Sequence, residues 1–205
     1  MTHAAVIAAG LAPLVWLAWR AWQGELEAEP IKDVTRETGI WTLRLLLACL
    51  AVTPLRRLLG WAELAPYRRT LGLLAFTYAM LHFLTYSVLD LWGEWATLVE
   101  DVLERPYVTV GFAGFLCLIP LAVTSTRAWL RRLGRRWVVL HRLVYVAAVA
   151  GCLHFLWLVK KDVREPLSYF AILGALFAAR LLLRLRPDWA AATKARKSAS
   201  LSASQ

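Results

Sequence analysis

The sequence contains six stretches of mainly apolar residues, each close to the roughly 20 residues that a membrane-spanning helix needs. They cover residues 4–22, 40–59, 70–91, 106–123, 137–160 and 166–185. Hydrophobic residues make up 60% of the chain, which is more than soluble domains of this size contain. Because a backbone in lipid must satisfy its own hydrogen bonds, such stretches fold as helices. We therefore predict an all-α, polytopic membrane protein, built as a bundle of six transmembrane helices.

Three local features refine this prediction. The stretch 40–59 is the weakest because Pro54 interrupts it, so we expect a short, kinked or tilted helix there. The acidic connector between the third and fourth stretches has Trp95, Leu98 and Val102 at helical spacing, which predicts an amphipathic helix on the outer membrane surface. The first stretch has no basic segment before it and no clear cleavage site after it, so we expect a retained helix.

The basic residues indicate how the bundle is oriented. The net charge is +10, but the Lys and Arg residues lie mostly between the apolar stretches, where they act as topology signals rather than as a nucleic-acid surface. Most of them fall on the side of the second and fourth connectors, and most acidic residues fall on the other side. Since cytoplasmic loops are enriched in Lys and Arg, this pattern predicts that both termini are cytoplasmic (N-in, C-in).

Three of the four histidines lie inside apolar stretches: His82 in the third, and His141 and His154 in the fifth. Ionisable groups at membrane depth are uncommon and usually mark a functional site. A zinc site would normally need four ligands, including Cys or carboxylate, and no such set is evident. Haem iron needs only one or two axial ligands, and histidine is a common one. We therefore predict a haem held by membrane histidines.

The depth of each histidine favours one pair. Measured from the basic ends of their helices at about 1.5 Å per residue, His82 differs in depth from His154 by about 8 Å and from His141 by about 12 Å. Axial ligands reach one iron from opposite faces at similar depth, so His82 and His154 are the favoured ligands. For His141 three roles stay open: a haem ligand by itself, a quinone or flavin contact, or a packed structural residue.

Long, ordered motifs surround these histidines. RRTLGLLAFTYAMLHFLTY contains His82, RPYVTVGFAGFLCLIPLAVTS follows it, and LGRRWVVLHRLVYVAAVAGCLHFLW contains His141 and His154. Over nearly the whole chain, including TPLRR at 53–57, the sequence resembles the ferric-reductase-like transmembrane domain family. Within that family it is similar to haem-binding membrane subunits of methionine sulfoxide reductase systems.

This resemblance implies several properties that the residues alone do not. It implies b-type haem held by His82, His141 and His154, in a transmembrane domain that we place at residues 1–186, before a polar cytoplasmic tail at 187–205. It also implies FMN, electrons from the quinone pool or a cytosolic flavin reductase, and a bacterial inner-membrane location. The implied partner is a periplasmic molybdenum enzyme that reduces methionine sulfoxide in oxidised proteins, a repair role. The subunit itself would transfer electrons rather than catalyse that reduction.

Two other functions are alternatives to this interpretation of the chain as an electron-transfer subunit. The first is a ferric or other metal reductase that passes electrons to a small external acceptor. The second is a transporter, or a structural membrane protein, whose histidines serve proton transfer or packing. The sequence contains no G-x-G-x-x-G fingerprint, so we expect its electrons to come from another molecule rather than from nicotinamide bound to this chain.

Overall fold

The computed structural model describes residues 2–185, and this part of the chain consists of helices and their connections. The helices are α1 (His3–Gln23), α2 (Pro30–Leu58), α3 (Tyr67–Leu84), α4 (Trp95–Glu104), α5 (Pro106–Val123), α6 (Arg127–Leu133), α7 (Arg135–Leu140), α8 (Leu143–Leu158) and α9 (Arg164–Leu185). A short 3-10 helix, η1 (Ala62–Leu64), precedes α3, and a π-helix, η2 (Thr85–Asp90), follows it. Six segments are long and apolar enough to cross a membrane, which confirms the predicted six-helix class. The predicted tail at 187–205 lies outside the described residues.

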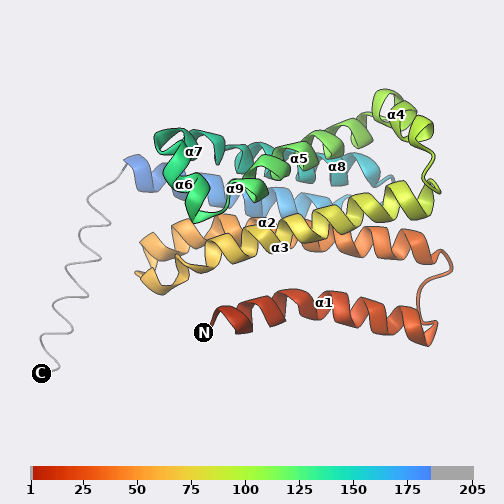
Figure 1. Ribbon diagram of the computed structural model, residues 1–205, viewed down its shortest axis with the longest axis horizontal. Helices are drawn as coiled ribbons and strands as arrows, with labels where there is room; N and C mark the ends of the chain where they lie inside the picture. Colours follow the sequence, from red (N-terminus) through yellow and green to blue (C-terminus); the bar gives the residue numbers. More distant parts are fainter. Residues whose placement is uncertain (1, 186–205) are drawn as a thin grey trace, which may run out of the picture.

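The spanning segments run side by side, and the bundle has two distinct ends (Figure 1). One end, called here the α4 end, carries α4 together with the connectors 24–29 and 159–163. The other, the arginine-rich end, carries α6 and the connectors 59–66 and 124–126. In Figure 1 the α4 end lies at the right, and the chain begins at the arginine-rich end on the left.

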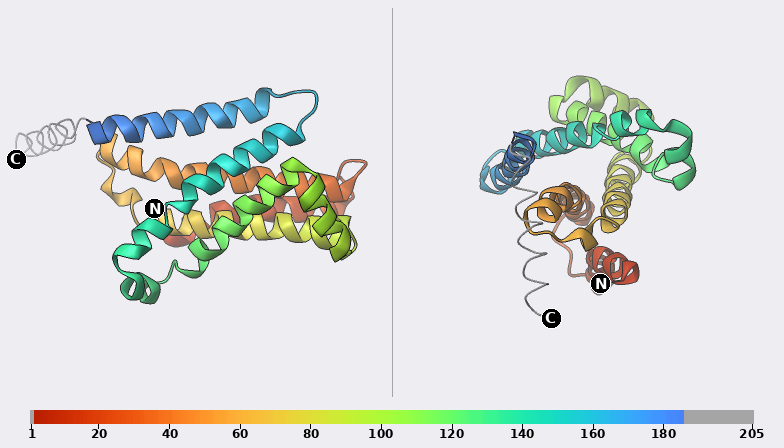
Figure 2. Two further views of the ribbon diagram at one scale, coloured as in Figure 1. Left: turned by 90° about the horizontal axis from the view of Figure 1, so that it is seen from above. Right: turned by 90° about the vertical axis from the view of Figure 1, so that its left-hand side faces the viewer.

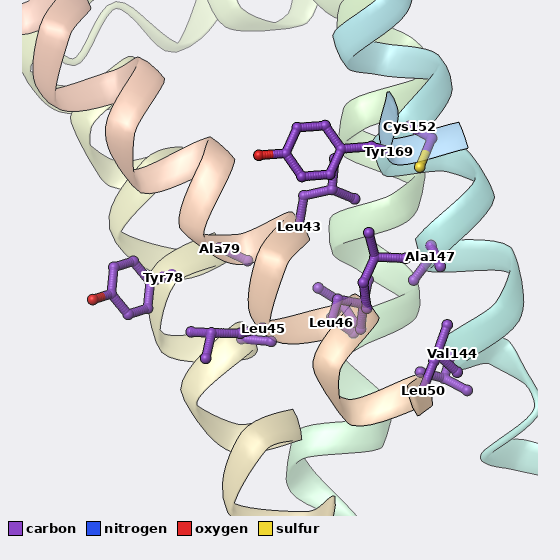
Figure 3. Packing of buried hydrophobic residues seen from close by; sticks show 14 of the residues in the cluster. Leu43, Leu45, Leu46, Leu50, Tyr78, Ala79, Val144, Ala147, Cys152 and Tyr169 are labelled. Carbon is purple, nitrogen blue, oxygen red and sulfur yellow. The ribbon is translucent and has the colours of Figure 1, made fainter. Parts of the chain in front are cut away.

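Two helix pairs form the centre of the bundle: α2 packs on α3, and α5 packs on α8. Smaller contacts join α3 to α5 and α2 to α8, α9 lies against α2 and α8, and α1 lies against α3, as the end-on view in Figure 2 shows. The leucines of α2 fill the centre. Leu45 points toward Tyr78 of α3, whereas Leu46 and Leu50 point toward Ala147 and Val144 of α8 (Figure 3).

Helix α2 begins at Pro30, well before residue 40, where we expected it to start. The added segment is polar, but its polar groups are satisfied locally. The buried carboxylate of Asp33 accepts hydrogen bonds from Arg20 Nη2 at 3.2 Å and from the Glu27 N–H at 3.4 Å. The Thr35 hydroxyl donates to a carbonyl one turn earlier in the same helix. A hydropathy pattern cannot register such compensation, so the predicted boundary was wrong.

Pro54 does not interrupt α2, which continues to Leu58. A proline has no N–H, so the carbonyl four residues earlier, that of Leu50, lacks its helical partner. Arg180 of α9 replaces this bond: its Nη2 donates to Leu50 O at 2.5 Å, and its Nη1 donates to the Tyr145 hydroxyl at 2.6 Å. The arginine therefore satisfies a backbone group that the proline leaves free, and it ties α9 to α2 and α8.

Replacing Arg180 by leucine is expected to destabilise the bundle by about 2 kcal/mol, because a buried carbonyl loses a charge-assisted hydrogen bond. Thermal or denaturant unfolding of the purified protein in detergent measures this loss. Pro54→Ala restores the backbone N–H that Leu50 O lacks. In that background Arg180→Leu should cost clearly less, and an equal cost in both backgrounds would contradict the pairing.

The fifth spanning segment is not one continuous helix. Helix α7 ends at Leu140, α8 begins at Leu143, and the two residues between them form a turn. There the backbone bonds shorten to i→i+3, from Arg142 N to Val139 O at 3.1 Å and from Tyr145 N to Arg142 O at 3.0 Å. Such a tightening changes the helical phase. The angle about the helix axis between the His141 and His154 side chains therefore cannot be calculated from their separation in sequence, as it could be on one ideal helix.

Candidate functional site

A cavity of about 620 Å³ lies among α2, α3, α5 and α8 and extends to α4, η2 and the first turns of α2; this end of the cavity is called here its mouth. This volume is within the range of sites that bind drug-sized ligands and cofactors. Most of its lining is apolar, and the residues come from both the α2–α3 pair and the α5–α8 pair. The inner apolar lining includes Ile40, Leu43, Leu46, Ala79, Phe83, Phe115, Leu118, Ala147 and Phe155.

His82 and His154 both line this cavity, from α3 and α8 respectively. Their ring centroids are 6.1 Å apart, and the ring planes are almost perpendicular at 83°. Two imidazole nitrogens each bound about 2 Å from one metal ion place the ring centres about 6 Å apart. The separation of these two side chains therefore matches that of two ligands sharing one metal ion.

Each of the two rings is fixed by a backbone carbonyl. The His82 Nδ1 lies 2.7 Å from Thr35 O, and the His154 Nδ1 lies 2.7 Å from Tyr107 O. A carbonyl only accepts hydrogen bonds, so Nδ1 must carry the proton, and a neutral ring then keeps its lone pair on Nε2. Metal-binding histidines are commonly oriented in this way by a hydrogen bond from their other ring nitrogen.

A glycine lies against each histidine ring, one helical turn after the carbonyl that holds it. A Cβ added to Gly39 would meet the His82 Nδ1 at 3.0 Å. A Cβ added to Gly111 would meet the His154 Nδ1 at 2.5 Å, closer than real side chains allow. These glycines let each ring approach the backbone of the facing helix.

Each histidine, its carbonyl partner and the glycine against its ring are called here a histidine seat. The two seats are built alike. In each, the histidine follows its carbonyl partner by 47 residues, and the two lie on a helix pair that packs together. One pair is α2 with α3, and the other is α5 with α8. We did not predict Thr35, Tyr107 or the two glycines. The one available signal was that each glycine precedes its histidine by the same number of residues.

His141 lies apart from this pair and does not line the cavity. It occupies the turn between α7 and α8, where its ring stacks on Trp137 with centroids 3.7 Å apart. Its Nδ1 lies 3.2 Å from Trp137 O, and the residue is half-buried. The structure therefore brings together two of the three predicted histidines and places the third toward the arginine-rich end.

The acidic connector contains a helix, α4, as predicted. Residues of α4 line the mouth of the cavity. Leu98 and Val102 of α4 face the cavity, whereas Trp95 is exposed. The buried carboxylate of Asp101 accepts a hydrogen bond from Tyr86 in η2, and its Oδ1 pairs with Arg105 Nε at 3.0 Å. A π-helix often occurs next to a functional site. Here it begins three residues after His82, in the segment between α3 and α4.

No second metal-binding set competes with the histidine pair. Within residues 2–185, no three His, Cys, Asp or Glu side chains converge in a way that would hold a metal ion. Cys49, Cys117 and Cys152 are free thiols, and the first and last of these are buried. Two histidines beside an apolar cavity suit a planar cofactor that carries its own equatorial ligands better than a bare zinc ion.

Comparisons with known proteins agree with this geometry. Residues 38–152 match the family described as ferric reductase like transmembrane component. A protein-methionine-sulfoxide reductase heme-binding subunit MsrQ from Xanthomonas oryzae pv. oryzae is 48% identical over 95% of this chain and 90% of its own length. The subunit of the same name from Caulobacter vibrioides is 48% identical over 90% of this chain and 87% of its own length. No solved structure matches the chain.

Proposed function

Because the chain belongs to the MsrQ family of ferric reductase like transmembrane proteins, we propose that it is a haem b-binding electron-transfer subunit of a protein-methionine-sulfoxide reductase. The observation that carries this proposal is the pair formed by His82 and His154 beside one apolar cavity. Their separation, their carbonyl partners and the glycines against their rings all fit the two axial ligands of one iron. His141 is a further candidate ligand by resemblance, separate from this cavity.

The residues of the chain and the haem have distinct roles in this proposal. Haem, when bound, supplies reversible one-electron chemistry. His82 and His154 would hold the iron, and Thr35 O and Tyr107 O keep the two rings in the tautomer that leaves the lone pair on Nε2. The apolar lining keeps water away from the site, and together with the axial ligands it sets the reduction potential.

The proposed orientation places the α4 end in the periplasm and both termini in the cytoplasm of a bacterial inner membrane. The arginine-rich end then faces the cytoplasm, as the distribution of Lys and Arg favours. The histidine pair lies toward the α4 end, close to the side from which a periplasmic protein would accept electrons. We propose that this acceptor is MsrP, the molybdenum enzyme of the system. Reducing one sulfoxide to a thioether and water takes two electrons and two protons, so the subunit delivers two electrons per product.

The electron donor is proposed to be the quinone pool or a cytosolic flavin reductase. The family resemblance also implies FMN, but the sequence contains no motif that identifies a flavin-binding site. We therefore assign no residues to FMN and derive no step through it.

The proposal is tested by adding purified MsrP and a protein containing methionine sulfoxide to spheroplasts that produce this chain. Sulfoxide reduction is expected only when both MsrP and the wild-type chain are present, and cells producing His154→Ala serve as the matched control. Since MsrP is added outside, activity also requires that the α4 end faces outward. Haem-dependent reduction of ferric chelates without any sulfoxide reduction would favour a metal reductase instead. A purified protein without reversible b-type absorbance bands would favour the transporter class.

A further inference from the structure

Charge on the lining of the histidine cavity is confined to one end. Apart from the two histidines, four lining side chains are charged: Lys32, Arg36, Asp90 and Arg105. All four lie at the α4 end, in the first turns of α2, at the end of η2 and just before α5. Toward the arginine-rich end the lining consists of apolar side chains such as Leu46. The cavity therefore has an apolar interior and a mouth with three cations and one carboxylate.

We propose that Lys32, Arg36 and Arg105 bind the two carboxylates of the haem and so fix which way the cofactor faces in the cavity. This inference rests on the proposed function. A haem b carries two carboxylates on one edge, and an ionised carboxylate among the inner leucines would be strongly disfavoured. At the α4 end the same groups meet guanidinium and ammonium donors, which form short, charge-assisted hydrogen bonds with carboxylates.

The cations differ in how firmly the protein holds them. Arg105 pairs with Asp101, whose carboxylate is buried and also accepts from Tyr86, so this arginine is held in position at the mouth. Arg36 Nη2 lies 3.5 Å from Glu165 Oε2, a long separation for an ion pair of this kind.

Lys32 pairs with Glu29, and both side chains are largely exposed. Exposed ion pairs contribute little stability. Arg36 and Lys32 can therefore exchange these partners for a ligand carboxylate at small cost, whereas Arg105 acts from a fixed position.

The test removes the charge on either side of the proposed contact. Full-length protein in detergent is titrated with haem or with its dimethyl ester, in which both carboxylates are neutral. Arg105→Gln and Arg36→Gln are each expected to weaken haem binding by about tenfold and to leave binding of the ester unchanged. Lys161→Gln, an exposed cation at the same end that does not line the cavity, should change neither.

Two further measurements separate a carboxylate contact from a structural role. With haem bound, losing a nearby cation should lower the reduction potential, since a positive charge favours the reduced form. Asp90→Asn, which removes the one lining carboxylate, should instead tighten haem binding.

Equal weakening for haem and ester, or no weakening for either arginine variant, would overturn the assignment. Because His82 and His154 are tested by their own variants, such a result would leave the proposed function standing.

Discussion

Replacing His82 or His154 by alanine is expected to reduce the haem absorbance of the purified protein to about a tenth of the wild-type value or less, because each variant removes one of the two proposed ligands. The two side chains lie on different helices, α3 and α8, and each is held by its own carbonyl. Neither can replace the other, so the two variants should behave alike. A reduced-minus-oxidised spectrum at equal protein concentration makes the measurement.

Variants of the other two histidines complete this experiment, and His3→Ala is its control. His3 lies at the arginine-rich end, exposed and 3.2 Å from the Thr70 hydroxyl, so His3→Ala should leave the spectrum unchanged. His141→Ala should lose only part of the absorbance, because His141 does not line the cavity. Wild-type absorbance in both the His82 and His154 variants would remove the basis of the haem assignment.

Adding a single methyl group at Gly111 is expected to be nearly as damaging as removing a histidine. The new Cβ would lie 2.5 Å from the His154 Nδ1 and 3.0 Å from its Cε1, so the ring must move away from Tyr107 O. Losing an orienting partner of a metal ligand typically costs about 10-fold to 100-fold in affinity. Haem content per protein, together with the shape of the absorbance bands, measures the effect of Gly111→Ala.

The other glycines provide a graded comparison. Gly39→Ala places its Cβ 3.0 Å from the His82 ring, so its effect should have the same sign and a smaller size. Gly174 of α9 has no atom within 4 Å of its added Cβ, so Gly174→Ala should retain all haem and slightly favour the helix. If Gly111→Ala and Gly174→Ala bound haem equally well, close packing against His154 would not be needed.

The sequence predicts the architecture well because a membrane imposes a simple rule on it. Apolar length alone located all six spanning segments, and residue depth selected His82 and His154 over His141 as the pair that lies together. Both inferences need only the rise of a helix and the thickness of a bilayer. Neither inference depends on side-chain detail. The structure confirms the six segments and places the His82 and His154 rings 6.1 Å apart, and their role as haem ligands stays a prediction.

What the sequence does not predict depends on contacts between distant backbone groups. The carbonyls of Thr35 and Tyr107 hold the histidines, and a carbonyl acceptor leaves no trace in residue type. The carbonyl that Pro54 leaves without a helical partner in α2 is satisfied by Arg180, far away in the chain. The start of α2 at Pro30 depends on partners that satisfy its polar first turns. In each case a tertiary hydrogen bond overrides the local pattern.

The matched histidine seats have a consequence for how the protein assembles. One seat belongs to the α2–α3 pair and the other to the α5–α8 pair, and the contacts between the pairs are fewer than those within them. A ligand that binds both seats adds its binding free energy to the association of the two halves. Cofactor supply would then control the lifetime of the protein as well as its activity, because halves joined weakly in lipid are open to proteolysis.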